Sequence, residues 1–587
     1  MAEKKQQPPD QAQRDLITSE LDTTMLVEAA AGTGKTTAMI SRMVALLAEG
    51  KCSIDTMAAV TFTRKAAAEL RARFQIDLEK EARSAKGEKG RRLRVAVETI
   101  ERCFIGTIHS FCARLLRERP VEAGVDLAFE ELDDVADARL RQQAWEDHIA
   151  KLFATDDPIL AELEGLGIEI RGVGPTFCAF CEYPDVDEWP AEKVPLPDLA
   201  PARKKLDQYV QHIRSLLDTL PPEAGNDKLM PKYRLISQVV RYTDVGTVRG
   251  LMAVLERFGE PGKTTVVQRN WPGGKAQALD ELASWDGFVE DIAQPLVKTW
   301  REHRYEPIIR AIMPARQQYD RLRQGAGGLN YQDLLMKAAD LLRDKPPIRK
   351  YFRKRFTHLL VDEFQDTDPI QAQVMLLLTA RSETETDWRK CRPVDGSLFV
   401  VGDPKQSIYR FRRADIATYN QVREIIERSG GRIVALSANF RTIGPLVQWV
   451  NGTFDQVFPA NATVYAPACR PIQVGRTMGS DGDFNGIRVL RVPSDCGDKN
   501  AIAEYEAELL ARTIQSAISK GRSIPRSQKD LERGATPAAA AGDFLIVTRT
   551  KERLSVYARK LEESGVPCQV TGGTALNEVD ELRLLHT

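Results

Sequence analysis

Residues 25–36 read MLVEAAAGTGKT, an apolar run that ends in a glycine-containing turn. A helical pattern follows at once, from Lys35 to Leu47. Apart from Ala29, which replaces the first glycine, residues 29–36 fit the phosphate-binding pattern GxxxxGK[ST]. In this pattern, backbone N–H groups of the turn and of the helix N-terminus hold phosphate oxygens. The alternative is a glycine turn before an ordinary helix, but the preceding strand and the following helix favour a phosphate site.

The residues of this turn indicate Mg·ATP as the ligand. Gly32 and Gly34 let the backbone curl so that its N–H groups point at the phosphates. Lys35 would place a positive charge near the β- and γ-phosphate oxygens, and Thr36 offers a hydroxyl to Mg²⁺. We therefore expect ATP and Mg²⁺ to bind here, with nucleotide contacts from Ala30, Ala31, Gly32, Thr33, Gly34, Lys35, Thr36 and Thr37.

A second motif, LLVDE at residues 359–363, is an apolar strand that ends in two acids. Buried carboxylates cost several kcal/mol unless they are paired or bind a metal, so this pattern is uncommon. Asp362 suits the Mg²⁺ site, together with Thr36. Glu363 suits the base that orients and activates the attacking water. An acidic strand end alone is weak evidence, but the lysine turn makes it a specific signal.

Strand and helix patterns alternate along the chain, which predicts an α/β fold with a parallel sheet covered by helices. From residue 121 to about 328 the pattern is instead rich in Leu, Ala, Glu and Arg, and predicts a mostly helical insertion. The expected strands of the sheet are Met25–Ala29, Met57–Phe62, Phe104–Thr107, His358–Asp362, Leu398–Val401 and Ile433–Leu436. Three later runs, Ile487–Val492, Phe544–Thr548 and Cys568–Val570, predict a second α/β domain.

Composition sets broad limits. A chain of 587 residues is too long for one core, so two to four domains are expected. Its 83 basic and 83 acidic residues cancel, which neither supports nor excludes nucleic-acid binding. Nine scattered cysteines suggest a reducing compartment, and Cys178 and Cys181 have no second pair at zinc spacing. No run of 18 apolar residues and no secretory signal is found, so we expect a cytoplasmic protein without a membrane partner.

Six blocks in order along the chain resemble motifs of UvrD/Rep-type superfamily 1 helicases. The strongest is VDEFQDTD at residues 361–368. The others are the phosphate turn, AVTFTRKAA at 59–67, GTIHSF at 106–111, VGDPKQSIYRFR at 401–412 and LSANFRT at 436–442. The PKQSIYRF wording and the long insertion are most similar to the RecB/AddA branch, the helicase–nuclease subunits.

The resemblance implies a RecA-like motor domain with a large helical insertion, followed by part of a second RecA-like domain. It implies an ATP-dependent 3′–5′ DNA helicase or translocase in DNA repair or recombination. The substrate would be single-stranded DNA, or duplex DNA with a 3′ tail, and the partner a second helicase–nuclease subunit. The expected domains are residues 1–120 and 330–437 for the first motor domain, 121–329 for the insertion, and 438–587 for the second motor domain.

The family's nucleotide contacts carry over by position. Gln13 resembles the glutamine that reads adenine, with Gln11 as a rival alignment, and Phe440 stands where a tyrosine usually faces the base. Thr37 stands where some relatives have an arginine near the base, so that contact is in doubt. Gln406 resembles the glutamine that senses the γ-phosphate, and Arg441 an arginine that touches it. The expected catalytic set is therefore Lys35, Glu363, Gln406 and Arg441.

The resemblance also predicts a track for single-stranded DNA, where aromatic side chains stack on bases and polar groups bond phosphates. Phe62 and Phe411 lie at strand ends where the family stacks bases. Taken alone, each residue has an ordinary alternative, such as a core phenylalanine or a helix cap. The expected DNA contacts are Thr61, Phe62, Thr63, Arg64, Thr107, His109, Ser110, Tyr409, Phe411 and Arg412.

Two further motifs of such helicases, a Ser-Lys-Gly-type DNA contact and a second ATP-facing arginine, have no match. The chain ends at Leu582–Thr587, within a helix-like run. We therefore expect a C-terminally incomplete motor that hydrolyses ATP poorly alone. The alternative function is a nucleotide-gated, non-catalytic DNA-binding subunit of a repair complex. A P-loop kinase or transporter ATPase is a third class, and the phenylalanine-bearing blocks speak against it.

Overall fold

The computed structural model describes residues 7–186, 188–189, 192–259, 264–475, 478–480 and 482–571. It divides into two compact units, residues 1–123 with 337–587 and residues 124–336. The four-part division expected from the sequence is finer than this and stays a prediction.

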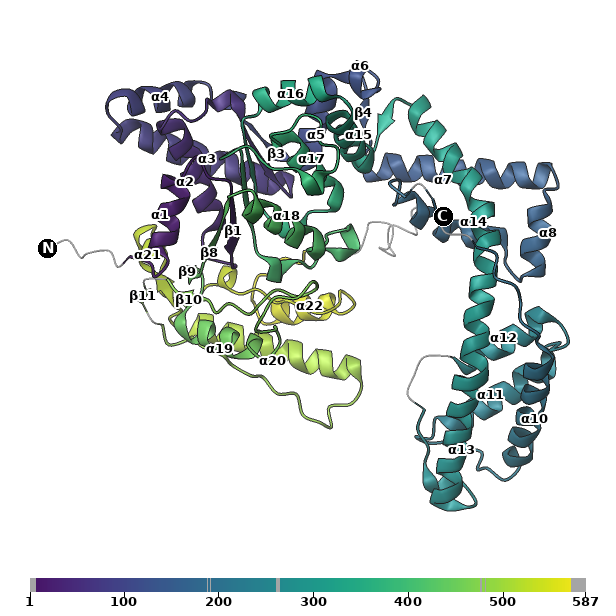
Figure 1. Ribbon diagram of the computed structural model, residues 1–587. Coiled ribbons are helices and arrows are strands. Elements are labelled where there is room, and N and C mark those ends of the chain that lie inside the picture. Colours follow the sequence, from purple (N-terminus) through teal and green to yellow (C-terminus); the bar gives the residue numbers. More distant parts are fainter. Residues whose placement is uncertain are drawn as a thin grey trace. The chain divides into compact units, whose positions relative to one another are not determined.

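A six-stranded parallel sheet forms the centre of the first unit, in the order β3-β2-β6-β7-β1-β8 (Figure 1). The predicted α/β class with a parallel sheet is thus confirmed. Val27 lies opposite Val401 and Val434, and Val60 lies opposite Val361, so the strands end at one edge. The strands are β1 (Met25–Ala29), β2 (Met57–Thr61), β3 (Phe104–Thr107), β6 (His358–Val361), β7 (Leu398–Gly402) and β8 (Arg432–Leu436).

Helices cover the sheet because its strands are apolar on both faces, as buried parallel strands are. Every residue of β2 and β7 is buried. On one face, Val27 and Phe399 pack with Met43 and Phe74 in a shared core cluster. The helices of this unit around the sheet are α1 (Gln11–Ser19), α2 (Lys35–Ala48), α3 (Arg64–Ser84), α4 (Gly87–Glu98), α5 (Ile108–Glu118), α16 (Pro346–Arg355), α17 (Pro369–Thr379) and α18 (Ile416–Arg428).

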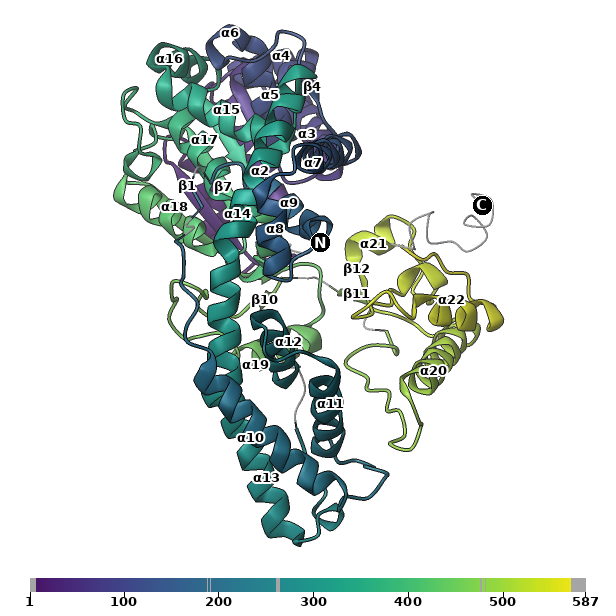
Figure 2. The same cartoon turned by 90° about the vertical axis from the view of Figure 1, so that its right-hand side faces the viewer.

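The second unit is mostly helical, as the sequence predicts (Figure 2). Its longest helix, α14 (Gln294–Gly325), contains Pro307 and Pro314 and contributes to two separate cores. Cys178 is exposed and Cys181 is buried, and the described residues hold no cluster of three or more potential metal ligands. The other helices are α7 (Asp134–Ala154), α8 (Pro158–Gly165), α9 (Gly174–Cys181), α10 (Ala200–Leu217), α11 (Leu229–Tyr242), α12 (Val248–Phe258) and α13 (Gly274–Phe288).

Residues 438–571 differ from the expected second α/β domain. None of the predicted strands Ile487–Val492, Phe544–Thr548 and Cys568–Val570 belongs to a sheet. Here β9 (Ala438–Asn439) pairs with β10 (Gln473–Val474), and β11 (Met478–Ser480) with β12 (Arg526–Ser527). The helices are α19 (Gly444–Phe454), α20 (Lys499–Ser519), α21 (Gln528–Glu532) and α22 (Leu554–Glu563).

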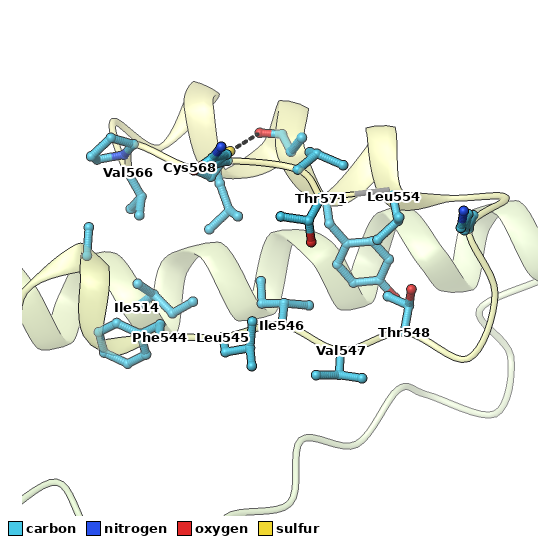
Figure 3. Close-up of a pocket in the computed structure, with 18 of the residues that line it drawn as sticks. Ile514, Phe544, Leu545, Ile546, Val547, Thr548, Leu554, Val566, Cys568 and Thr571 are labelled. Carbon is cyan, nitrogen blue, oxygen red and sulfur yellow. Dashed lines mark hydrogen bonds between the residues drawn. The ribbon is translucent and has the colours of Figure 1, made fainter. Parts of the chain in front are cut away.

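Residues 544–548 and 566–571 line a groove of about 800 Å³ beside α20 and α22 (Figure 3). Val566 points toward Ile514 and Phe544, which share a small apolar core. Leu545 and Val547 are more than four-fifths exposed, so the strand pattern here has no second face to bury against. Among the described helices, none is long and apolar enough to cross a membrane.

Candidate functional site

The turn between β1 and α2 has the backbone of a phosphate cradle. Gly32 and Gly34 have φ of +76° and +86°, the left-handed region that favours glycine. A Cβ on Gly32 would lie 2.7 Å from the Cβ of Arg441, so a side chain is excluded there. Lys35 is the first residue of α2, which leaves the N–H groups of the first helical turn available to an anion.

Lys35 and Glu363 meet at this edge of the sheet. The Lys35 ammonium donates to Glu363 Oε2 at 2.8 Å, and the Lys35 side chain is only 10% exposed. Gln365 Nε2 donates to the same oxygen at 2.7 Å. Burial works to raise the pKa of Glu363, but Lys35 and Gln365 outweigh it, so the pKa lies below its usual value. Glu363 is therefore a charged carboxylate next to the phosphate turn.

Asp362 is the natural cation ligand of the site. Burial, followed by repulsion from Glu363, raises the pKa of this carboxyl to about 6, while the Thr36 hydroxyl hydrogen-bonds to it and lowers the pKa. A buried carboxylate whose charge is poorly compensated, beside a hydroxyl, is the hard oxygen donor set that Mg²⁺ prefers. Thr36 and Asp362 thus fit the predicted metal.

The N-terminal helix is tied to the phosphate turn by residues that the sequence analysis missed. Arg14 binds both carboxylate oxygens of Asp10, at 2.8 and 2.9 Å, and donates to the Thr33 carbonyl at 2.9 Å. Its guanidinium lies 4.9 Å from the centre of the Phe440 ring. The Asp10 carboxylate also accepts the N–H groups of Ser437 and Ala438, both at 2.9 Å. Asp10 is the N-cap residue of α1 and lies four residues before Arg14, a spacing that could have predicted their ion pair.

The two candidate adenine readers differ in their surroundings. Both Gln11 and Gln13 lie on α1. The amide of Gln11 donates to Asp15 at 2.7 Å, within the helix. Gln13 is half-buried in the first turn of α1, directly before Arg14. The reading of adenine by either glutamine stays a prediction. Thr37 lies in the first turn of α2.

Residues 439–441 lie directly against the phosphate turn. Asn439 Nδ2 donates to the Ala31 carbonyl at 2.7 Å, and the Phe440 N–H donates to the Gly32 carbonyl at 2.8 Å. The Asn439 carboxamide oxygen accepts the N–H of Arg441 at 2.9 Å. Phe440 is 40% exposed, so one part of its ring is open to a ligand. The structure therefore brings Phe440 and Arg441 to the nucleotide side, while Asn439 is a contact that the sequence analysis missed.

Gln406 lies in the turn after β7. Its Nε2 donates to Asp403 Oδ2 at 2.6 Å, and the Asp403 N–H donates to Gln365 Oε1 at 2.9 Å. The turn is thus connected to Glu363 through Gln365 rather than through Gln406. A direct γ-phosphate contact of Gln406 stays a prediction.

Aromatic side chains form a continuous run at the ends of β2 and β7. The rings of Phe62 and Tyr409 are 5.5 Å apart and stacked at 30°, and those of Tyr409 and Phe411 are 5.8 Å apart. Phe411 is 77% exposed. An exposed run of rings at a strand edge is suited to stacking on unpaired bases.

The polar residues assigned to DNA have structural partners as well. Thr61 Oγ1 donates to the Thr63 carbonyl at 3.1 Å, and Thr63 and Thr107 cap α3 and α5 by accepting backbone N–H groups. Ser110 Oγ donates to the Thr107 carbonyl at 2.8 Å. Arg64 begins α3 and His109 lies in the first turn of α5. The side chain of Arg412 lies outside the described part of the chain. The DNA roles of these residues stay predictions.

Comparisons with known proteins give one family. Residues 10–427 match the UvrD/REP helicase N-terminal domain. Similar curated proteins are named as subunits of an ATP-dependent helicase/nuclease. That of Geobacillus kaustophilus is 26% identical over 96% of this chain and 49% of its own length. Those of Geobacillus thermodenitrificans and Staphylococcus carnosus are 25% and 22% identical, over 49% and 48% of their lengths. The chain spans about half the length of the curated relatives it matches.

Proposed function

Because this chain belongs to the UvrD/REP helicase family, we propose that it is the motor of an ATP-dependent DNA helicase that acts in repair or recombination. Its substrate is single-stranded DNA, or duplex with a 3′ tail, along which it moves 3′ to 5′. One observation carries the proposal: Lys35 and Glu363 meet at 2.8 Å beside Asp362, on the sheet edge that also bears Phe62 and Tyr409.

Hydrolysis follows from a change of partners at Glu363. The phosphates of ATP would compete with the Glu363 carboxylate for the Lys35 ammonium. Once Lys35 binds phosphate, Glu363 can accept a proton from the attacking water. Thr36 and Asp362 would hold Mg²⁺, which neutralises charge on the phosphate oxygens when it is bound. Arg441 packs against Gly32 of the phosphate turn, where its cation would stabilise the developing charge.

DNA binding uses the aromatic run that follows β2 and β7. Phe62, Tyr409 and Phe411 offer a series of rings on which bases of any sequence can stack, which is what a translocating protein needs. Alternating grip on the strand, driven by closing and opening around ATP, would convert hydrolysis into steps.

The name of the relatives indicates the larger context of this motor. They are subunits of a helicase/nuclease. We therefore infer that this chain also works with a second helicase–nuclease subunit on DNA.

The proposal is tested by ATP hydrolysis of the 587-residue chain with and without single-stranded DNA. In line with the poor hydrolysis expected from the sequence, we expect a low rate that DNA stimulates and that Lys35→Ala abolishes, because the phosphate-binding cation is gone. Lys51→Ala is the control, since this exposed lysine pairs with Asp22 outside the site. A rate of hydrolysis that does not change with DNA, or that is unchanged in Lys35→Ala, would contradict the proposal.

Two outcomes refine it. Displacement of a strand from duplex with a 3′ tail, but not a 5′ tail, supports the direction. DNA affinity that changes with nucleotide, without any hydrolysis, favours the alternative of a nucleotide-gated, non-catalytic DNA-binding subunit.

A further inference from the structure

Gln365 is a buried amide with both ends occupied. It is 3% exposed and lies in the short turn after β6. Its Nε2 donates to Glu363 Oε2 at 2.7 Å, and its Oε1 accepts the N–H of Asp403 at 2.9 Å. Its backbone carbonyl accepts the Ser407 hydroxyl at 3.0 Å. One residue thus connects the carboxylate of the site with the turn that follows β7.

The packing around Gln365 leaves little room for it to move independently. A Cβ on Gly402 would lie 3.0 Å from Gln365 Oε1 and 3.2 Å from its backbone nitrogen. The glycine at the end of β7 therefore allows the two turns to touch. Since the contact is this close, a shift of the turn after β7 is transmitted to Gln365.

The turn that Gln365 holds leads into the aromatic run. Residues 403–411 begin with Asp403, whose N–H Gln365 accepts, and continue to Tyr409, whose ring stacks on Phe62. DNA bases stacked here would fix the position of this segment. The Gln365 amide would then transmit the position of this segment to the Glu363 carboxylate.

Lys35 and Gln365 donate to the same oxygen of Glu363. When ATP phosphates draw Lys35 away, the Gln365 amide still holds this oxygen. The orientation of Glu363 toward the attacking water then depends on Gln365.

From these contacts we propose that Gln365 is a positioning residue that couples DNA contact at residues 403–411 to the placement of Glu363 for hydrolysis. This inference rests on the proposed function. Gln365 itself touches neither ATP nor DNA in this scheme, and acts only through Glu363 and Asp403.

Two variants test it. Gln365→Glu keeps an acceptor for the Asp403 N–H but replaces the donor to Glu363 with a carboxylate. Gln365→Met keeps the approximate length and adds no charge, but removes both hydrogen bonds. Gln371→Glu is the matched control, because it places the same charge change on another buried glutamine, on α17.

Hydrolysis is measured at steady state over a range of ATP concentrations, with labelled ATP so that slow rates remain measurable. We expect the ratio of kcat with and without single-stranded DNA to fall at least about fivefold in both Gln365 variants, the lower end of typical coupling. The KM for ATP and the Kd for DNA should stay close to the wild-type values. A merely structural role would instead change KM, Kd and melting temperature together.

The outcomes separate the two proposals. If the wild-type protein is not stimulated by DNA, the proposed function fails and this inference fails with it. If the wild-type protein is stimulated and both variants are stimulated equally, only the role of Gln365 is overturned. Melting curves decide whether Gln365→Glu is folded at the assay temperature, and otherwise Gln365→Met carries the test.

Discussion

The six-stranded sheet and residues 478–571 begin from similar sequence and reach different structures. The strands β1, β2, β6 and β7 are mainly apolar runs of four or five residues, and so is the segment 544–548. In the sheet, β1 has a parallel neighbour on each side and Val27 is fully buried. In the second region, residues 544–548 pair with no strand, and Leu545 is 86% exposed.

The difference shows that an apolar run predicts a tendency to form a strand, whereas neighbours decide whether the strand forms. Each strand inside the sheet has its backbone N–H and C=O groups paired on both sides, which buried backbone requires. A run without such neighbours has no strand to pair its backbone and leaves one set of its side chains exposed, here Leu545 and Val547. The candidate site is built around the ends of the sheet strands, because strand ends can position side chains only where the strands are fixed.

Hydrogen exchange gives the largest expected contrast between the two regions. Amides of β1 and β7 should exchange only on global opening, because they lie in the centre of the sheet. With a typical stability of about 5–15 kcal/mol, that slows exchange by at least about a thousandfold. Amides of residues 544–548 should exchange nearly as fast as an open chain. Slow exchange at 544–548 would show that this segment is paired in solution and would remove the contrast.

Paired substitutions sharpen the comparison. Phe399→Ala in β7 should lower the free energy of unfolding by about 3–5 kcal/mol, because it leaves a cavity in the core and removes the ring under the Arg42 guanidinium. Leu545→Ala should change it by no more than about 0.5 kcal/mol, because that side chain is exposed. Urea denaturation measures both. A loss of several kcal/mol in Leu545→Ala would mean that this segment packs against something in solution.

The same contrast explains what the sequence could predict. The residues from Gly32 to Lys35 and the Asp362–Glu363 pair could be predicted because each motif contains its own backbone geometry and chemistry. Their meeting follows from parallel strands that end at one edge. The connections through Arg14 and Gln365 could not be predicted, because they depend on which turns touch after folding.

Phe62→Ala tests whether the ordered strand ends hold DNA. Removing one stacking ring should weaken binding of single-stranded DNA by about 1–3 kcal/mol, or roughly 5- to 150-fold in Kd. Its neighbour Tyr409 loses the stacked partner at the same time. Ile76→Ala is the control, since this residue of α3 is 64% exposed and lies outside the aromatic run. Fluorescence anisotropy with a labelled oligonucleotide measures the affinity, and equal affinity in the two variants would argue against the track.

The smallest expected effect is an acid sensitivity of the sheet at the start of β6. Burial, assisted by the nearby Arg42 charge, lowers the pKa of His358 to about 4, against 6.5 for an ordinary histidine. Between pH 6.5 and about 4, His358 is therefore protonated in the unfolded chain and mostly neutral in the folded chain. The free energy of unfolding falls as the pH falls through this window. His358→Gln, which cannot titrate, should reduce the dependence of the melting temperature on pH across this range. The two proteins should differ less in this dependence above about pH 7, where His358 is neutral in both states. His358 is the first residue of a paired strand of the sheet. If the melting temperatures of the two proteins fell equally from about pH 7 to about pH 4.5, this strand end would be more open to water than its burial indicates.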